Sequence, residues 1–376
     1  MCRRFDSYRG HVLKFLSVER NAALLLLLSV VAGLMLANGP FGTSFADLIH
    51  SPFTVPGASL SIADFVGEFL MTGFFLLVGL ELKREFNSGV FQNRMALAIP
   101  GLAALFGALI PSAWYVFATW GDKTAVAGWG IPMATDLTFA LAVFSIFGRA
   151  LPQSARTFVL AFAVLDDLIA ILVIALFVGS NPNLYWVALA AVSLVAFWWA
   201  SRINARWMML LSALVGWYLL FLSGVQPAVL GVALGLLVQS RQVEALETAI
   251  HPWVSLGVLP LFAFLSSQVS IGAEFDFGAP VVIGVMLRPL GKFIGILFGA
   301  QLGRWLVGSN SFAELRLRHF AALATLGGIG FSVALLIANR TFGYGSELAN
   351  QAIVATLLAM LVSMVISAVA LSAKRR

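Results

Sequence analysis

Charged residues are scarce in this chain of 376 residues. Only 11% are Asp, Glu, Lys or Arg, against roughly 25% in soluble domains, and 60% are hydrophobic. A water-facing surface needs more charge than this, so the composition excludes a soluble globular protein. A β-barrel is disfavoured as well, because its strands alternate apolar and polar residues, whereas the apolar residues here form long runs.

Cysteine is almost absent too. A single residue, Cys2, excludes an intramolecular disulfide. The four histidines, His11, His50, His251 and His319, have no metal-ligand spacing, so no cofactor is expected. The net charge of +6 is what basic cytoplasmic loops give a membrane protein, and no nucleic acid partner is expected.

The chain contains twelve apolar segments, several shorter than the roughly 20 residues of a standard span. They are Ala23–Asn38, Phe65–Leu82, Met95–Phe117, Gly130–Phe147, Thr157–Val178, Tyr185–Ala200, Trp207–Leu222, Gln226–Val238, Val254–Ser267, Val281–Gly303, His319–Ala338 and Gln351–Leu371. The first has no small-residue cleavage site after it, so we expect a span there and not a signal peptide.

Lysine and arginine are unevenly distributed between the loops. With twelve spans and a cytoplasmic N-terminus, nineteen fall on the cytoplasmic side and two, Lys123 and Arg340, on the outer side. This asymmetry follows the positive-inside rule. The sequence predicts an all-α polytopic membrane protein, one domain over 1–376, with both termini cytoplasmic. In the first outer loop, about 45–62, the alternation around Pro56-Gly57 predicts a small β-hairpin at Phe53–Ile62, with a plain surface turn as the alternative.

Carboxylates occur where a bilayer disfavours them. Asp166 and Asp167 lie in the middle of Thr157–Val178, where each charge costs about 2.5–3.5 kcal/mol. Function is favoured over polar contacts between helices, for which Asn or Gln would serve. Adjacent helical residues point about 100° apart, so both aspartates can face one cavity. Pro132, followed by Thr135 and Asp136, predicts a broken helix in which the Thr135 hydroxyl and the Asp136 carboxylate face a wet cavity. The alternative is a capped helix start at the membrane surface.

Other charges fall within or beside spans. Lys292, near the middle of the tenth segment, needs a partner, and the mid-span aspartates are available. Arg288, one turn away, is expected to extend to the outer surface. Glu68 lies inside the second segment. Glu81 and Glu85 share one face at its cytoplasmic end, where they line a funnel or form a solvated helix end.

Glycines interrupt the eleventh segment. Gly327, Gly328 and Gly330 are poor residues for a helix interior, so we expect a second broken helix, with a close-packed helix crossing as the alternative. Interrupted segments four and eleven in opposite halves are what inverted repeats over about 95–178 and 281–371 would produce. A mid-membrane binding site between two discontinuous helices is then expected.

Oxygen ligands decide the chemistry that such a site can perform. Carboxylates and hydroxyls suit hard cations, and the segments offer no soft or imidazole ligand set. Two crowded aspartates can hold protons or a small metal cation, and the two compete. Competition at one site that opens alternately to each side is sufficient for exchange of a cation against protons.

The motifs resemble a known family over nearly the whole chain, from about Asn21 to the last span. The resemblance is carried by Gly73–Glu85, Pro132–Asp136, Ala163–Asp167, His251–Val254 with Leu259–Phe264, Gly291-Lys292 and Gly327–Ser332. These segments resemble the NhaA-type sodium/proton antiporters, which are themselves an example of the inverted-repeat rule used above.

The resemblance implies twelve helices, two of them interrupted and crossed, and exchange of cytoplasmic sodium or lithium for outside protons, activated at alkaline pH. By motif position, Asp166 and Asp167 would bind the cation (transient sodium or lithium) and protons. Asp136 and Thr135 would lie at the helix crossing, and Lys292 would pair with the site.

The resemblance also implies a bacterial inner membrane location and a homodimer supported by the hairpin. A cytoplasmic pH-responsive region would comprise Glu81, Arg84, Glu85, Glu247 and His251. Gln226 and Thr248 depart from the pattern, since some relatives have histidine there, which bears on the pH range of activation.

Three other functions are weighed. A sodium-coupled solute symporter would share the architecture but would need a pocket with further polar or aromatic groups. An intramembrane aspartyl protease would show Tyr-Asp and Gly-x-Gly-Asp signatures, which are missing around the mid-span aspartates. A channel is opposed by Lys292 beside the site. The chain is expected to be a secondary transporter and not an enzyme.

Overall fold

The fold was analysed in a computed structural model that describes residues 21–55, 58–88, 94–177, 182–269, 275–308, 312 and 314–373. Cys2, His11, the turn Pro56-Gly57 and the basic residues at both ends of the chain lie outside this part. Seven of the described helices are long and apolar enough to cross a membrane, or up to ten if each of three bent pairs is one span. The chain is therefore a multi-pass membrane protein.

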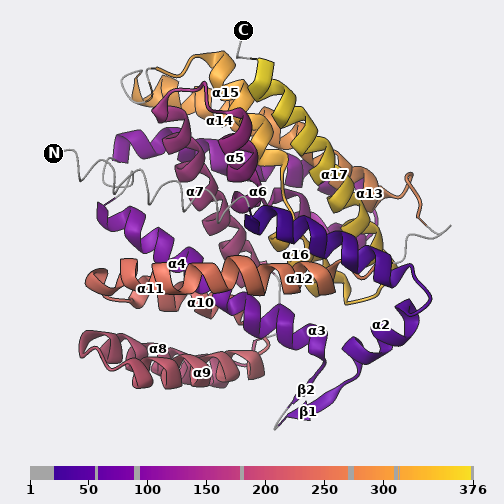
Figure 1. The fold of residues 1–376 in the computed structure, drawn as a ribbon, viewed down its shortest axis with the longest axis vertical. Coiled ribbons are helices and arrows are strands. Elements are labelled where there is room, and N and C mark those ends of the chain that lie inside the picture. The colour runs from indigo at the N-terminus through magenta and orange to yellow at the C-terminus, as the bar shows by residue number, and fades with distance from the viewer. Residues whose placement is uncertain are drawn as a thin grey trace.

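The helices form two groups (Figure 1). The crossing group comprises α5 (Arg94–Ala118), η3 (Ala125–Met133), α6 (Leu137–Phe147), α7 (Gln153–Phe177), α13 (Pro280–Met286), α14 (Arg288–Val307), α15 (Leu317–Ala324), η5 (Thr325–Gly328), α16 (Ser332–Phe342) and α17 (Glu347–Ser372). The flanking group comprises α3 (Ile62–Phe65), η1 (Val66–Leu70), α4 (Met71–Ser88), α8 (Leu184–Arg202), α9 (Arg206–Leu222), α10 (Ala228–Leu237), α11 (Ser240–Trp253), η4 (Val254–Val258) and α12 (Leu259–Ser266).

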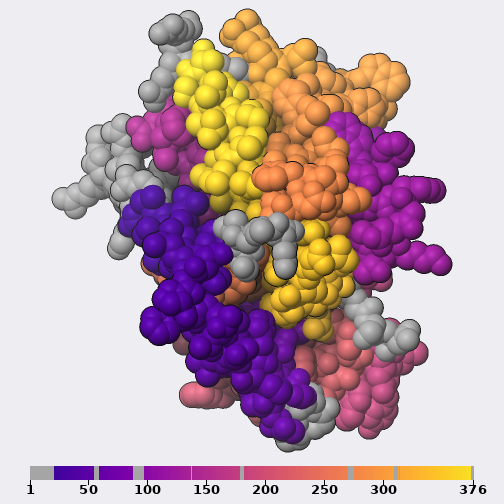
Figure 2. All heavy atoms as spheres, turned by 90° about the vertical axis from the view of Figure 1, so that its right-hand side faces the viewer, coloured from indigo at the N-terminus to yellow at the C-terminus, as the bar shows by residue number. Residues whose placement is uncertain are grey.

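The N-terminal segment lies along one side of the molecule. It contains a helix at Asn21–Ala37, then α2 (Gly42–His50), bent from it by 109°. Two short strands follow, β1 (Phe53–Val55) and β2 (Ala58–Leu60), which pair antiparallel with Phe53 opposite Leu60. On the face drawn in Figure 2, the indigo N-terminal segment, α13 in orange and α17 in yellow lie at the surface.

Along one face of α14, the helix packs on α5 backbone against backbone. Glycines at every fourth position, Gly291, Gly295, Gly299 and Gly303, line one face of α14. A Cβ at Gly299 would lie 2.1 Å from the carbonyl oxygen of Leu102. Small residues at this spacing let helix backbones approach closely in a bilayer. The pair α5–α14 is the tightest contact of the crossing group.

Two breaks in helices of the crossing group meet. Between η3 and α6, residues 134–136 are extended, and between η5 and α16, residues 329–331 are not helical. The backbone N–H of Asp136 donates to the carbonyl of Ile329 at 2.7 Å, and the Thr135 hydroxyl donates to the carbonyl of Gly327 at 2.9 Å. The two non-helical segments therefore cross each other inside the group.

Two predicted segments have other limits in the structure. The ninth, predicted at Val254–Ser267, belongs to a helix that runs from Ser240 to Ser266 through α11, the π-helical turn η4 and α12. The sequence prediction began too late because α11 is charged on one face, which lowers its hydropathy although its helical periodicity continues. The tenth is bent by 42° between α13 and α14, where Pro289 occupies the first turn of α14.

The α5–α14 contact gives a stability prediction. Gly299→Val should destabilise the protein by about 1–3 kcal/mol, because the added side chain overlaps the α5 backbone. Thermal unfolding of the purified protein in detergent measures the effect as a fall in midpoint of several degrees. Gly73→Ala is the matched control, since a Cβ there meets nothing within 4 Å, and it should unfold like the wild type. Equal midpoints for both variants would contradict the assigned contact.

Candidate functional site

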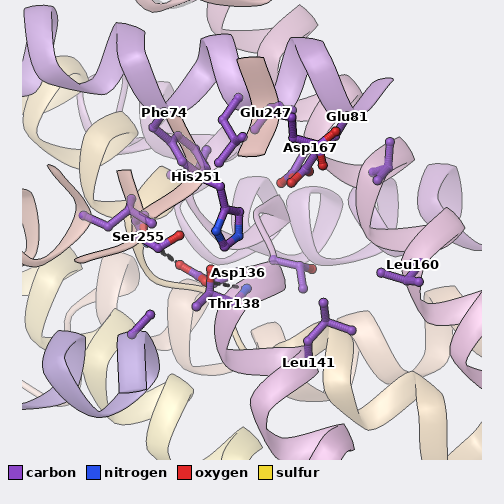
Figure 3. Close-up of a pocket in the computed structure, with 18 of the residues that line it drawn as sticks. Phe74, Glu81, Asp136, Thr138, Leu141, Leu160, Asp167, Glu247, His251 and Ser255 are labelled. Atoms are coloured by element: carbon purple, nitrogen blue, oxygen red, sulfur yellow. Dashed lines mark hydrogen bonds between the residues drawn. The ribbon is translucent and has the colours of Figure 1, made fainter. Parts of the chain in front are cut away.

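A cavity of about 280 Å³ with carboxylates in its wall lies between the two helix groups (Figure 3). Its lining comes from α4 and α11–α12 of the flanking group and from α6, α7, α16 and residues 135–136 of the crossing group. The polar and charged lining residues are Glu81, Arg84, Glu85, Thr135, Asp136, Thr138, Arg156, Asp167, Glu247, His251, Ser255 and Ser332. Apolar side chains such as Phe74, Leu160 and Val164 complete the wall.

Asp136 connects the starts of two helices. As the N-cap of α6 it accepts the N–H groups of Thr138 and Phe139 at 3.1 and 3.4 Å through Oδ1. Its Oδ2 accepts the Ser332 hydroxyl at 2.7 Å and the Ser332 N–H at 3.4 Å, at the start of α16. One buried carboxylate thus satisfies unpaired donors at two helix N-termini, where negative charge is favoured.

Asp167 faces the cavity from the middle of α7 and is 7% exposed. Among the described residues it has no hydrogen bond or ion pair, and its carboxylate points toward the same space as Glu81 in Figure 3. An oxygen ligand without a protein partner at the wall of a wet cavity is available to a proton or a hard cation.

Asp166 faces α14 and not the cavity. Its two carboxylate oxygens lie 2.7 and 2.8 Å from Lys292 Nζ, and both side chains are almost fully buried. The predicted pairing of Lys292 with a mid-span aspartate is thus observed. Both aspartates could have faced one cavity, but of the two only Asp167 lines this one, and Asp166 is directed at α14.

The predicted pH-responsive residues lie together at the rim of the cavity. Arg84 forms ion pairs with Glu247 and, at 3.6 Å, with Glu85. The Arg84–Glu247 pair joins the end of α4 to α11. Glu81 and His251 line the cavity wall between this rim and Asp136. All five predicted residues therefore line one cavity.

The glycines of the eleventh segment serve the crossing in different ways. A Cβ at Gly330 would lie 2.1 Å from the carbonyl oxygen of Ala134, so the two chains touch by backbone there. A Cβ at Gly328 would lie 2.6 Å from Ser363 Oγ, and at Gly327 it would meet the Ile296 side chain.

Arg288 does not reach the surface, contrary to the sequence prediction. It is fully buried, donates from Nη2 to the carbonyl of Thr356 at 3.1 Å, and its Nη1 lies beside Gly330. The signal was present in the sequence: Arg288 and Lys292 are four residues apart and share a helix face, so a buried Lys292 implies a buried Arg288.

Sequence reasoning missed two polar residues of this site and gave no role to two others. The two missed residues are Ser332, which donates a hydrogen bond to Asp136, and Arg156, which lines the cavity. Apart from lying near the motifs, neither belongs to a sequence pattern that predicts this role. Glu68 and Arg340 form an ion pair that could be found only in three dimensions.

Two residues depart from the family pattern. Gln226 is buried, and its side-chain amide has no hydrogen-bond partner. The Thr248 hydroxyl donates to the carbonyl of Glu244 in its own helix.

A multi-pass helical fold with crossed chain breaks and a carboxylate-lined cavity is the architecture of an ion-coupled transporter. The chain belongs to the family described as Na+/H+ antiporter 1, whose model matches residues 13–371. The resemblance to NhaA-type antiporters is thereby confirmed.

Individual relatives agree. The chain is 37% identical to Na(+)/H(+) antiporter NhaA 2 of Clavibacter michiganensis, over 95% of this chain and 91% of that protein. It is 34% identical to Na(+)/H(+) antiporter NhaA of Aeromonas salmonicida, over 88% of both chains. The solved sodium proton antiporter MjNhaP1 from Methanocaldococcus jannaschii shares the fold, with a TM-score of 0.59 at 15% identity over 97% of both chains.

The Asp166–Lys292 pair gives a second stability prediction. Lys292→Met leaves a buried carboxylate without its partner and should cost about 3–5 kcal/mol. Thermal unfolding in detergent should show a lowered midpoint. Adding Asp166→Asn removes the stranded charge, so the double variant should recover most of the loss. A double variant as unstable as Lys292→Met alone would show that the pair is not the source of the effect.

Ser332 gives a third prediction. Ser332→Ala removes the 2.7 Å hydrogen bond to Asp136 and should weaken apparent sodium affinity several-fold, because the carboxylate loses a positioning donor. Ser332→Thr keeps the hydroxyl and is the matched control. Sodium-dependent transport by the two variants in vesicles measures the difference, and equal affinities would assign Ser332 no part in the site.

Proposed function

We propose that this protein is a sodium(lithium)/proton antiporter that exports cytoplasmic sodium or lithium in exchange for external protons. The supporting observation is the cavity between the helix groups, which reaches Asp167 and Asp136 and offers carboxylate and hydroxyl oxygens. Such oxygens bind hard cations and protons alike. The names of the relatives agree with this exchange.

Exchange follows from competition at Asp167. A proton neutralises the carboxylate, and a sodium ion binds only after that proton leaves. A site that is open to one side at a time then carries either species across but never both together. Thr135, Asp136 and Ser332 supply further oxygens within the same cavity. We also assign Asp166 to the site: its ion pair with Lys292 opens when Asp167 gains or loses its charge.

We propose that the chain spans a bacterial inner membrane twelve times with both termini cytoplasmic. Seven long helices, three bent pairs and the shorter apolar helices α9 and α10 of the described chain support this number. The charge asymmetry supports the orientation. Two of the spans are then the interrupted ones, η3–α6 and α15–α16, one in each inverted repeat.

In this orientation the cavity opens to the cytoplasm. Its rim residues, Arg84, Glu85 and Arg156, belong to the cytoplasmic ends of α4 and α7. Glu81, Arg84, Glu85, Glu247 and His251 would then be the first groups that cytoplasmic protons meet, which supports a pH-regulating role. The antiparallel strands β1 and β2 would lie on the outer side, where we propose that they support a homodimer.

The symporter is not favoured by the cavity. The charged lining residues surround a cavity of only about 280 Å³. The carboxylates that would bind an ion face the same space that an organic solute would need. No observation on the described residues supports a second substrate.

The exchange is tested in inside-out membrane vesicles that are acidified by respiration. The pH gradient is followed optically while sodium or lithium is added at neutral and alkaline pH. The wild type should collapse the gradient in a cation-dependent manner, and Asp167→Asn should lose this response because its neutral amide has no titratable proton and no charge to hold a cation. Asp166→Asn should lose it as well.

Glu314→Gln is a matched carboxyl-to-amide control, because Glu314 is exposed and outside the cavity. It should respond like the wild type. No response from the wild type at any pH would refute antiport. A response that survives in both aspartate variants would leave antiport supported but would refute the assignment of the site to these aspartates.

A further inference from the structure

An ion pair between a buried carboxylate and a partly exposed arginine lies at the other end of the cavity-lining helices. Glu68 Oε1 and Arg340 Nη1 are 2.6 Å apart, and the Glu68 side chain is 3% exposed. Glu68 lies about 20 Å along its helix from Glu81, and Arg340 lies about 12 Å along α16 from Ser332. Neither lines the cavity. The α4 and α16 segments thus run from the cavity to one shared contact.

This contact joins the two helix groups. Glu68 belongs to η1 of the flanking group and Arg340 to α16 of the crossing group. The other pairs described above lie within one group: Arg84–Glu247 joins α4 to α11, and Lys292–Asp166 joins α14 to α7. A change in the relative position of the groups therefore has to change the Glu68–Arg340 distance.

The residues between the cavity and the pair are apolar and closely packed. Met71 and Phe75 on α4 and Leu336 and Ile337 on α16 are at most 3% exposed. They separate the ion pair from the cavity. In the orientation proposed above, this is the closed outer end of the transport path.

The local backbone is arranged around Glu68. It lies in the π-helical turn η1, a rare feature that is frequent at functional sites. Its own carbonyl accepts the Thr72 hydroxyl at 2.6 Å and the Trp217 indole N–H at 3.3 Å. These bonds hold the residue on the flanking group, while Glu68 Oε2 is buried without a partner.

Stability alone does not account for this pair. Burying a carboxylate costs desolvation that its ion pair only partly offsets, whereas a pair that separates during a transition biases one state over another. Arg340 is 32% exposed, so its guanidinium can be rehydrated when the contact breaks.

We propose that Glu68 and Arg340 hold the outer end closed, and that this ion pair must separate each time the cation site opens to the outside. Both are positioning residues, since neither reaches the cation site. The proposal rests on the alternating exchange proposed above. The pair sets the balance between the two open states, and its loss favours the outward-open one.

A cleavable cross-link tests whether the pair must separate. Glu68→Cys and Arg340→Cys are placed in a Cys2→Ser background and joined by a short bis-methanethiosulfonate reagent. Exchange in proteoliposomes should stop on cross-linking and return when dithiothreitol cleaves the link. The control pair is Ser201→Cys with Gln242→Cys, which joins α8 to α11 within the flanking group, where the native side chains are 3.0 Å apart. Its cross-link should leave exchange unchanged.

Neutral variants test the balance without cross-linking. Glu68→Gln and Arg340→Gln should weaken apparent sodium affinity from the cytoplasmic face and strengthen it from the outer face, each by roughly fivefold. The exchanged pair, Glu68→Arg with Arg340→Glu, should move both values back toward the wild type. A merely structural role would lower the amount of folded protein without opposite shifts.

Two results would overturn the proposal: cross-linked protein that exchanges at the uncross-linked rate, or shifts in the same direction on both faces. The wild type separates this failure from that of the proposed function. Exchange by the double-cysteine variant that persists after cross-linking defeats the ion-pair proposal alone, whereas a wild type without exchange defeats antiport itself.

Discussion

The carboxylate of Asp136 is the point at which the two broken helices depend on each other. The first turn of any helix has N–H groups without an internal partner, and a bilayer has no water to bind them. In this fold the starts of α6 and α16 come together, and Asp136 accepts donors from both. The crossing is stable because one buried negative charge satisfies two helix ends that would otherwise be unpaired in an apolar surrounding.

The remaining buried charges are arranged so that one carboxylate stays available. Asp166 is bound to Lys292, and Asp136 is bound to the helix starts, which leaves Asp167 facing the cavity. Three aspartates that look equivalent in composition therefore have three different surroundings. The difference comes from the direction in which each side chain leaves its helix, together with what the facing helix presents.

Much of this was accessible from the sequence because hydropathy and charge report on the bilayer directly. The mid-span aspartates, Lys292 and the Pro132 and glycine breaks all stood out against apolar runs. The sequence did not show in which direction each of these side chains points. It did not separate Asp167 from Asp166, and hydropathy hid the helical α11 behind its charged face. The prediction for Arg288 was wrong because its burial was inferred from its position along the segment. The helix face that it shares with the buried Lys292 was not considered.

The contact between α5 and α14 has a consequence for motion. Helices that meet through interlocking side chains can slide by small changes of rotamer, as in shear movements. Along the face of Gly291, Gly295, Gly299 and Gly303, backbone lies directly against backbone, so rotamer changes cannot absorb a shift there. The two helices must travel as one rigid unit that carries Lys292 with it. Any separation of Lys292 from Asp166 then has to come from the lysine side chain or from α7, and not from a displacement of α14 along α5.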